Sequence, residues 1–162
     1  MKTRGQIQIS FGMIFSIIII IATVAVGFYV INYFLNLGSC TKTGLFWNDL
    51  RDEVDKAWNS DITQTIFKGN VPSGIDYVCF GNISVASAGD SEMNIVVSEL
   101  KNYGEDDKNS FIYPPKRACE IAFYNLKHAS FDSFFCVREK SGSVSVKLSK
   151  SSSDALVKLS RP

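Results

Sequence analysis

The stretch FGMIFSIIIIIATVAVGFYVINYFLNL, residues 11–37, decides how this chain is organised. A helix needs about 20 apolar residues to cross about 30 Å of hydrocarbon, so the stretch is long enough to span a membrane with some tilt. A cleaved secretory signal has an apolar core of only about 7–15 residues, whereas this stretch continues without a charge or a proline. We therefore expect a retained transmembrane helix over residues 11–37, after a cytoplasmic basic leader over residues 1–10.

The charged residues lie on either side of this apolar stretch. The chain has 162 residues and a formal net charge of +1, yet no Asp, Glu, Lys, Arg or His occurs between Gly5 and Thr41. All 16 acidic residues follow that gap, together with 15 of the 17 basic ones, so the part from Lys42 onward carries −1. With 20% charged and 46% hydrophobic residues, a largely disordered chain and a strongly basic nucleic-acid binder are disfavoured. The uncharged apolar segment excludes a simple soluble protein.

The cysteines indicate on which side of the membrane the polar part lies. All four follow the apolar stretch and none forms a Cys-x-x-Cys pair: Cys40, Cys79, Cys119 and Cys136. An even set of this kind suits two disulfides in an oxidising compartment better than a zinc site. Basic residues flank both ends of the span, so the positive-inside rule does not decide the orientation. We expect the amino terminus in the cytoplasm and residues 38–162 outside, with four reduced cysteines facing the cytosol as the alternative.

Two modifications and a disulfide pairing can be predicted for this exterior part. Asn82-Ile83-Ser84 has the pattern of an N-glycosylation acceptor, with Asn82 as the modified residue. Of the three possible connectivities, loop closure favours the shorter loops, which join Cys40 to Cys79 and Cys119 to Cys136. Leu37-Gly38-Ser39-Cys40 also resembles a bacterial lipobox, in which Cys40 would be acylated and an odd number of cysteines would remain.

The exterior part is expected to fold as one small α+β domain. Gly38–Gly44 has the composition of a breaker-rich link, and apolar residues from Leu45 to Ala57 then recur at spacings of three and four, which predicts a short amphipathic helix ending near Trp58. Short β-prone runs separated by turn residues follow, as in an antiparallel sheet. The expected strands are Thr63–Lys68, Ile75–Phe80, Asn94–Leu100, Ser110–Tyr113, Phe134–Glu139, Ser143–Ser149 and Leu156–Leu159. The turn Lys140-Ser141-Gly142 predicts a hairpin between the fifth and sixth of these. Two disulfides would help to stabilise a domain of about 120 residues.

The amino terminus carries a resemblance to a known family. Lys2-Thr3-Arg4-Gly5-Gln6, followed by Gln8-Ile9-Ser10-Phe11-Gly12 and the apolar run, resembles the class III signal peptides of archaeal type IV pilin-like proteins. The resemblance implies that a membrane peptidase cuts between Gly5 and Gln6. It also implies that the apolar helix serves first as an anchor and later as the core of a filament, below a β-rich, disulfide-bonded head. The segment Tyr113–Cys119, with the pattern Tyr-Pro-Pro-x-x-Ala-Cys, is similar to one in an uncharacterised family of archaeal single-span proteins.

Two positions depart from the pilin-like pattern. The triplet Gln8-Ile9-Ser10 starts two residues later than a cut after Gly5 requires, and Gly12 stands where the family has a glutamate. In the family that carboxylate meets the amino terminus of a neighbouring subunit inside the filament. Because burying an unpaired charge is costly, the missing carboxylate removes one reason for the subunits to stack. The anchor does not depend on it.

The sequence contains no recognisable catalytic, metal-binding or cofactor-binding motif. His128 is the only histidine, and no Gly-x-Gly-x-x-Gly, Walker loop, His-Glu-x-x-His or Gly-x-Ser-x-Gly occurs. We therefore expect no enzyme, no catalytic residues, no metal and no cofactor, with His128 as a surface or capping residue. The expected partners are the lipid bilayer and other copies or pilin-like subunits, without nucleic acid or a small-molecule substrate. The resemblance to pilin-like proteins implies a structural or adhesive role at the cell surface, the alternative being a non-polymerising binding or accessory subunit of a membrane complex.

Overall fold

The computed structural model of the chain describes residues 11–86, 91–103 and 107–162. The chain divides into two compact units, unit 1 (residues 1–37) and unit 2 (residues 38–162). The first helix, α1 (Phe11–Trp58), supplies the described residues of unit 1 and the first 21 residues of unit 2. An α+β fold with a long amino-terminal apolar helix, a mainly antiparallel β domain and two disulfides confirms the predicted fold class.

The predicted link Gly38–Gly44 is helical and belongs to α1, which corrects the expectation of a separate short helix. A glycine inside a helix costs about 1 kcal/mol relative to alanine, which is why two glycines in seven residues suggested a break. Tertiary contacts outweigh that cost here, because the Thr43 side chain is fully buried and Cys40 is bonded to a distant cysteine.

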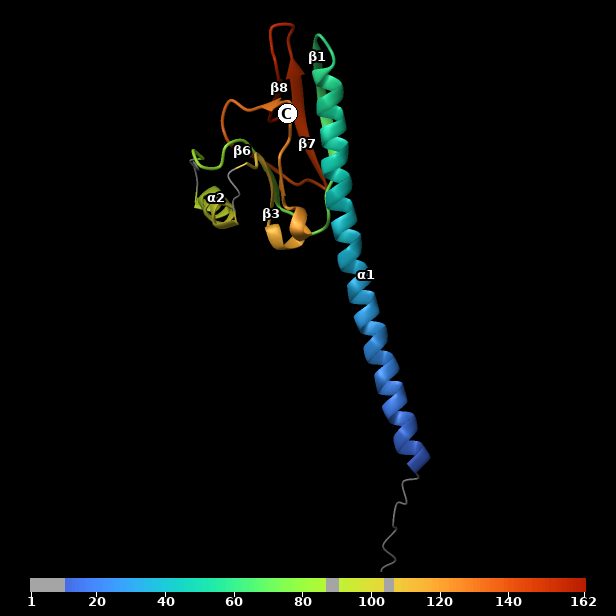
Figure 1. The fold of residues 1–162 in the computed structure, drawn as a ribbon. Coiled ribbons are helices and arrows are strands. Elements are labelled where there is room, and N and C mark those ends of the chain that lie inside the picture. The colour runs from blue at the N-terminus through green and yellow to red at the C-terminus, as the bar shows by residue number, and fades with distance from the viewer. Residues whose placement is uncertain (1–10, 87–90, 104–106) are drawn as a thin grey trace, which may run out of the picture. The chain divides into compact units, whose positions relative to one another are not determined.

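Unit 2 contains two four-stranded sheets, which lie beside the second half of α1 (Figure 1). Sheet A has the order β1 (Thr63–Asn70), β7 (Ser143–Lys150), β8 (Val157–Ser160), β5 (Ala129–Ser130). Its pairs are antiparallel except for β5 with β8. Sheet B is antiparallel and has the order β4 (Phe123–Tyr124), β3 (Ser110–Tyr113), β2 (Tyr77–Phe80), β6 (Phe135–Arg138). Two short 3-10 helices, η1 (Pro115–Arg117) and η2 (Cys119–Ile121), connect β3 to β4.

The main core lies between α1, one face of sheet A and one face of sheet B. Alternate residues of sheet A point into it, as expected for strands with one buried face: Phe67, Val144, Val146, Leu148 and Leu159. The stripe of α1 that was predicted from spacing covers them except for Leu45, which is exposed. The Phe46 ring meets the Phe67 ring edge-on, with centroids 5.9 Å apart. Gly69 allows the Phe46 ring to lie close to the β1 backbone, because a Cβ at this position would be 2.6 Å from that ring.

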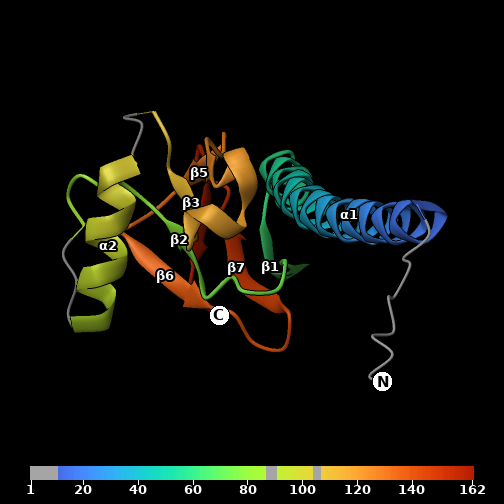
Figure 2. The same cartoon turned by 90° about the horizontal axis from the view of Figure 1, so that it is seen from below.

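A second helix, α2 (Ser91–Tyr103), covers the other face of sheet B (Figure 2). Val96, Val97 and Leu100 are its buried residues, and Val96 and Leu100 pack with Cys79, Phe111 and neighbouring side chains in a second apolar cluster. The strand predicted over Asn94–Leu100 is therefore wrong. Those β-branched residues suggested a strand, but their buried positions recur at helical spacing and their partners come from sheet B.

The other predicted strands are confirmed to within two residues at their ends, but the predicted hairpin is wrong. A turn does connect β6 to β7, with Lys140 and Ser143 exchanging backbone hydrogen bonds of 2.9 and 3.2 Å. Beyond that bridge the strands separate, since β6 pairs with β2 in sheet B and β7 pairs with β1 and β8 in sheet A. The hydrophobic alternation was correctly predicted, but the pairing depends on distant strands.

Candidate functional sites

The apolar part of α1 is the most conspicuous feature of unit 1. Every side chain from Phe11 to Phe34 is exposed, and the most apolar 18-residue window has a mean hydropathy of 2.8. Its polar side chains bond within the helix, for Ser16 Oγ donates to the Gly12 carbonyl and Thr23 Oγ1 to the Ile20 carbonyl. Among the described residues this is the one helix long and apolar enough to cross a membrane. The predicted processing residues Gly5 and Gln6 lie outside the described residues.

The two disulfides pair differently from the loop-length prediction. Cys40 is bonded to Cys119, and Cys79 to Cys136, so the predicted pairs Cys40–Cys79 and Cys119–Cys136 are wrong. Cys79 and Cys136 are direct partners in the register of β2 and β6, with their Cα atoms 3.9 Å apart. Doubling a loop costs only about 0.6 kcal/mol, which is too little to outweigh strand pairing. Because the Cys40 sulfur is bonded to Cys119, it is not free for acylation, and the lipobox alternative is contradicted.

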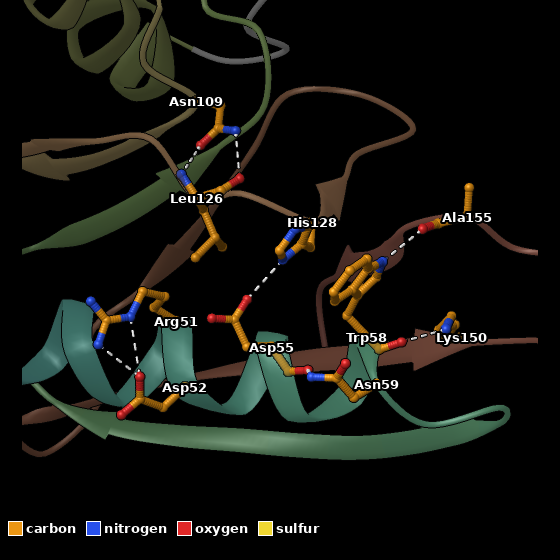
Figure 3. Close-up of polar contacts among 10 residues, drawn as sticks. All are labelled: Arg51, Asp52, Asp55, Trp58, Asn59, Asn109, Leu126, His128, Lys150 and Ala155. Carbon is orange, nitrogen blue, oxygen red and sulfur yellow. Dashed lines mark hydrogen bonds and ion pairs between the residues drawn. The ribbon is translucent and has the colours of Figure 1, made fainter.

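The end of α1 is fastened to two distant segments of the chain by a cluster around His128 (Figure 3). His128 Nδ1 lies 2.9 Å from Asp55 Oδ1, and the imidazole stacks on the Trp58 ring with centroids 3.9 Å apart. The Trp58 indole N–H donates to the Ala155 carbonyl at 3.0 Å. His128 is half-buried, with a left-handed φ of 59°. The only histidine thus joins α1 to the segments before β5 and β8.

Lys150 binds the carbonyl end of α1 (Figure 3). Its Nζ donates to the Trp58 carbonyl at 2.5 Å and to the Ser60 carbonyl at 3.0 Å. The Asn59 side-chain amide donates to the Asp55 carbonyl at 2.8 Å. The Asp55 carbonyl also accepts from the Asn59 backbone N–H at 3.0 Å. Lys150 satisfies the carbonyl of Trp58, the last residue of α1, and a cation at a helix carboxyl terminus is favourable.

Two tyrosines of sheet B hold α2 in place. The Tyr77 hydroxyl donates to Glu92 at 2.6 Å, and the Tyr113 hydroxyl donates to Glu99 at 2.9 Å. The hydrogen bond to the glutamate, followed by burial, raises the pKa of each tyrosine above its ordinary value. Arg138 lies 5.6 Å above the Tyr77 ring and 3.9 Å from Glu92. Sequence patterns did not reveal these pairs, because α2 was predicted to be a strand.

The predicted glycosylation acceptor Asn82 lies in the loop that follows β2. Its side chain is exposed, and its Oδ1 accepts a hydrogen bond from the Ser84 backbone N–H at 2.9 Å. Ser84 is also exposed, while Ile83 between them is buried. The acceptor amide is therefore accessible, and its modification stays a prediction.

Within residues 11–86, 91–103 and 107–162, no group of three or more His, Cys, Asp or Glu side chains is arranged to hold a metal ion. All four cysteines are in disulfides. Comparison of the chain with protein-family models, curated proteins and solved structures finds no match. The two features that bear on function are an apolar helical segment and a disulfide-bonded α+β unit.

Proposed function

We propose that this chain is a single-pass membrane protein of pilin-like design, with its amino terminus in the cytoplasm and unit 2 outside the cell. The proposal is supported by one combination: a fully exposed apolar helical segment followed by a unit with two disulfides. Disulfides of this kind persist in oxidising compartments and are rare in the cytosol. The role that fits is structural or adhesive, with unit 2 presented at the cell surface.

Protease accessibility tests the orientation. Protease added to intact cells or spheroplasts should remove residues after Cys40 and leave a membrane-bound fragment that contains the apolar segment. A cytosolic protein in the same sample must stay intact, as the control for leakage. Protection of unit 2 until detergent is added would contradict the outward orientation and the proposed surface role.

Processing after Gly5 tests the pilin-like part of the proposal. A peptidase that needs a small residue at the cut should leave a native protein that begins at Gln6, and Gly5→Leu should block the cut. The matched control Thr3→Leu adds a similar side chain away from the cut and should still be processed. Mass spectrometry of the amino terminus distinguishes these forms. A native terminus at Met1 or Lys2, in cells that process their own pilins, would leave only a plain signal anchor.

Electron microscopy of the purified protein after detergent removal distinguishes a filament-forming protein from a non-polymerising subunit. Ordered filaments are expected of a pilin-like protein. Dispersed particles would favour the alternative, a non-polymerising binding or accessory subunit, which the glycine at position 12 supports because it supplies no carboxylate for a neighbouring amino terminus.

A further inference from the structure

On the outward side of sheet A, the strand residues of β1, β7 and β8 include lysines and no acidic residue. Nine side chains of β1, β7 and β8 occupy the positions that alternate with the buried core residues: Gln64, Ile66, Lys68, Asn70, Ser145, Lys147, Ser149, Lys158 and Ser160. None of them is acidic and none is aromatic. Because residues from Lys42 onward carry a net charge of −1, this face concentrates positive charge that the composition of the unit does not reveal.

The three lysines of this face form one diagonal row. In the strand register, Lys158 lies opposite Ser149, which is two residues from Lys147 on the same strand. Lys68 lies opposite Ser145, two residues from Lys147 in the other direction. Each step therefore moves one strand across and two residues along, a diagonal separation of about 7–8 Å. The row crosses three adjacent strands, β8, β7 and β1 (Figure 1).

Two of these lysines have no ion-pair partner among the described residues. No carboxylate of that part of the chain lies within ion-pair distance of Lys68 or Lys147, whereas Lys158 Nζ lies 2.5 Å from Asp132. The serine hydroxyls at positions 145 and 149 lie on β7 on either side of Lys147. Free ammonium groups that alternate with hydroxyls can bind a ligand with repeated negative charges and polar groups.

The positive surface continues from Lys68 into a hollow of about 460 Å³. Arg138 and Lys140 line this hollow together with Lys68, Ile66 and Ser145. No Asp or Glu side chain lines it, and the last residue of the sequence, Pro162, lies at its edge with the terminal carboxylate. Arg138 is partly engaged with Glu92, while Lys140 has no ion-pair partner among the described residues. The hollow extends the row toward β6, so the cationic surface is longer than a single small anion can cover.

We propose that this face of sheet A, the lysine row with its adjoining hollow, binds an acidic polysaccharide. Repeated carboxylates of such a polymer would meet the lysines, and its hydroxyls would meet the serines, Gln64 and Asn70. Proteins that bind single-stranded nucleic acid stack bases on aromatic side chains, and this face has none. An acidic polysaccharide would be the ligand through which the protein adheres. This proposal rests on the proposed location of unit 2 outside the cell.

Binding by the full chain in nanodiscs of zwitterionic lipid tests the proposal. The probe is polygalacturonate, with neutral dextran of similar size as the comparison. Polygalacturonate should bind at low salt, its affinity should fall as the salt concentration rises, and dextran should not bind. K68Q/K147Q should weaken binding about tenfold, as expected when two exposed charge contacts are lost, and K68R/K147R should restore it.

A matched control separates the lysine row from overall charge. K56Q/K116Q removes the same charge from α1 and η1, outside sheet A, and should change binding by less than about twofold, because long-range charge is screened. Absence of polygalacturonate binding, or an equal loss of affinity in K68Q/K147Q and K56Q/K116Q, would overturn the proposal. Tighter lysine-dependent binding to phosphatidylglycerol vesicles or to a single-stranded oligonucleotide would overturn it in favour of a membrane or a nucleic acid. None of these results depends on orientation or polymerisation, which the cell-based experiments test separately.

Discussion

The two disulfides should contribute unequally to stability, in the order opposite to that predicted from loop length. In the chain-entropy relation, the sequence separation of 79 residues between Cys40 and Cys119 corresponds to about 4.5 kcal/mol. The separation of 57 residues between Cys79 and Cys136 corresponds to about 4.2 kcal/mol. On entropy alone, removing the first disulfide should therefore cost about 0.3 kcal/mol more.

Burial reverses this order. Cys79 and Cys136 are 0% and 5% exposed and belong to the apolar cluster under α2, whereas Cys40 and Cys119 are half-buried. Replacing a buried sulfur by hydrogen loses contacts worth about 1 kcal/mol, comparable to a methylene group, and leaves a small cavity. C79A/C136A should therefore be less stable than C40A/C119A by about 1–2 kcal/mol, each variant keeping the other disulfide.

Urea unfolding followed by tryptophan fluorescence measures this difference. Both tryptophans of the chain, Trp47 and Trp58, lie in unit 2, so the signal reports unit 2 and not the apolar segment. C79V/C136A is the matched control, because it lacks the crosslink but refills part of the space and should regain about 1 kcal/mol. A C79A/C136A variant as stable as C40A/C119A, or more stable, would refute the reasoning from burial.

Two further predictions concern a pair of glycines and a pair of tyrosines. Gly44→Ala should raise the free energy of unfolding by about 0.5–1 kcal/mol, because the residue is helical and its Cβ would meet its nearest neighbour at 3.7 Å. Gly69→Ala should lower it by about 1–3 kcal/mol, because its Cβ would lie 2.6 Å from the Phe46 ring, and urea midpoints that move in the same direction would contradict this contrast. The raised pKa values of Tyr77 and Tyr113 favour the protonated tyrosines in the folded state, so their contribution is complete below their ordinary pKa of 10.0 and is lost as the pH rises through the raised values. Unfolding at about pH 8 and about pH 11 should show a larger loss for the native protein than for Y77F/Y113F, and equal losses would exclude these tyrosines as the cause.

Local patterns were reliable where one segment determines its own structure. The apolar run of residues 11–37 is helical and is long and apolar enough to cross a membrane, and its composition alone indicated this. The stripe from Phe46 to Ala57 and the alternation of Val144, Val146 and Leu148 correctly indicated a helix face and a strand face. These periodicities depend only on residue spacing.

The partners of each segment could not be predicted in the same way. Sequence order suggested that Phe134–Glu139 pairs with Ser143–Ser149, but the two strands belong to different sheets, where more distant strands pair with them. The disulfide partner of Cys79 is Cys136 because β2 lies beside β6, a relation that loop lengths do not contain. The run at residues 94–100 became a helix because its apolar residues meet sheet B.

What the sequence determined by itself was the division of the chain into an apolar helical segment and a polar, cysteine-containing α+β part. Composition and spacing act over one or two turns of backbone, which is sufficient to place helices, strands and a membrane-length segment. Only the tertiary structure decided the two sheets, the disulfide pairs and the lysine row, in which Lys68, Lys147 and Lys158 lie on adjacent strands although β1 is about 80 residues from β7. Their proximity follows from strand register, and register depends on which buried faces pack together.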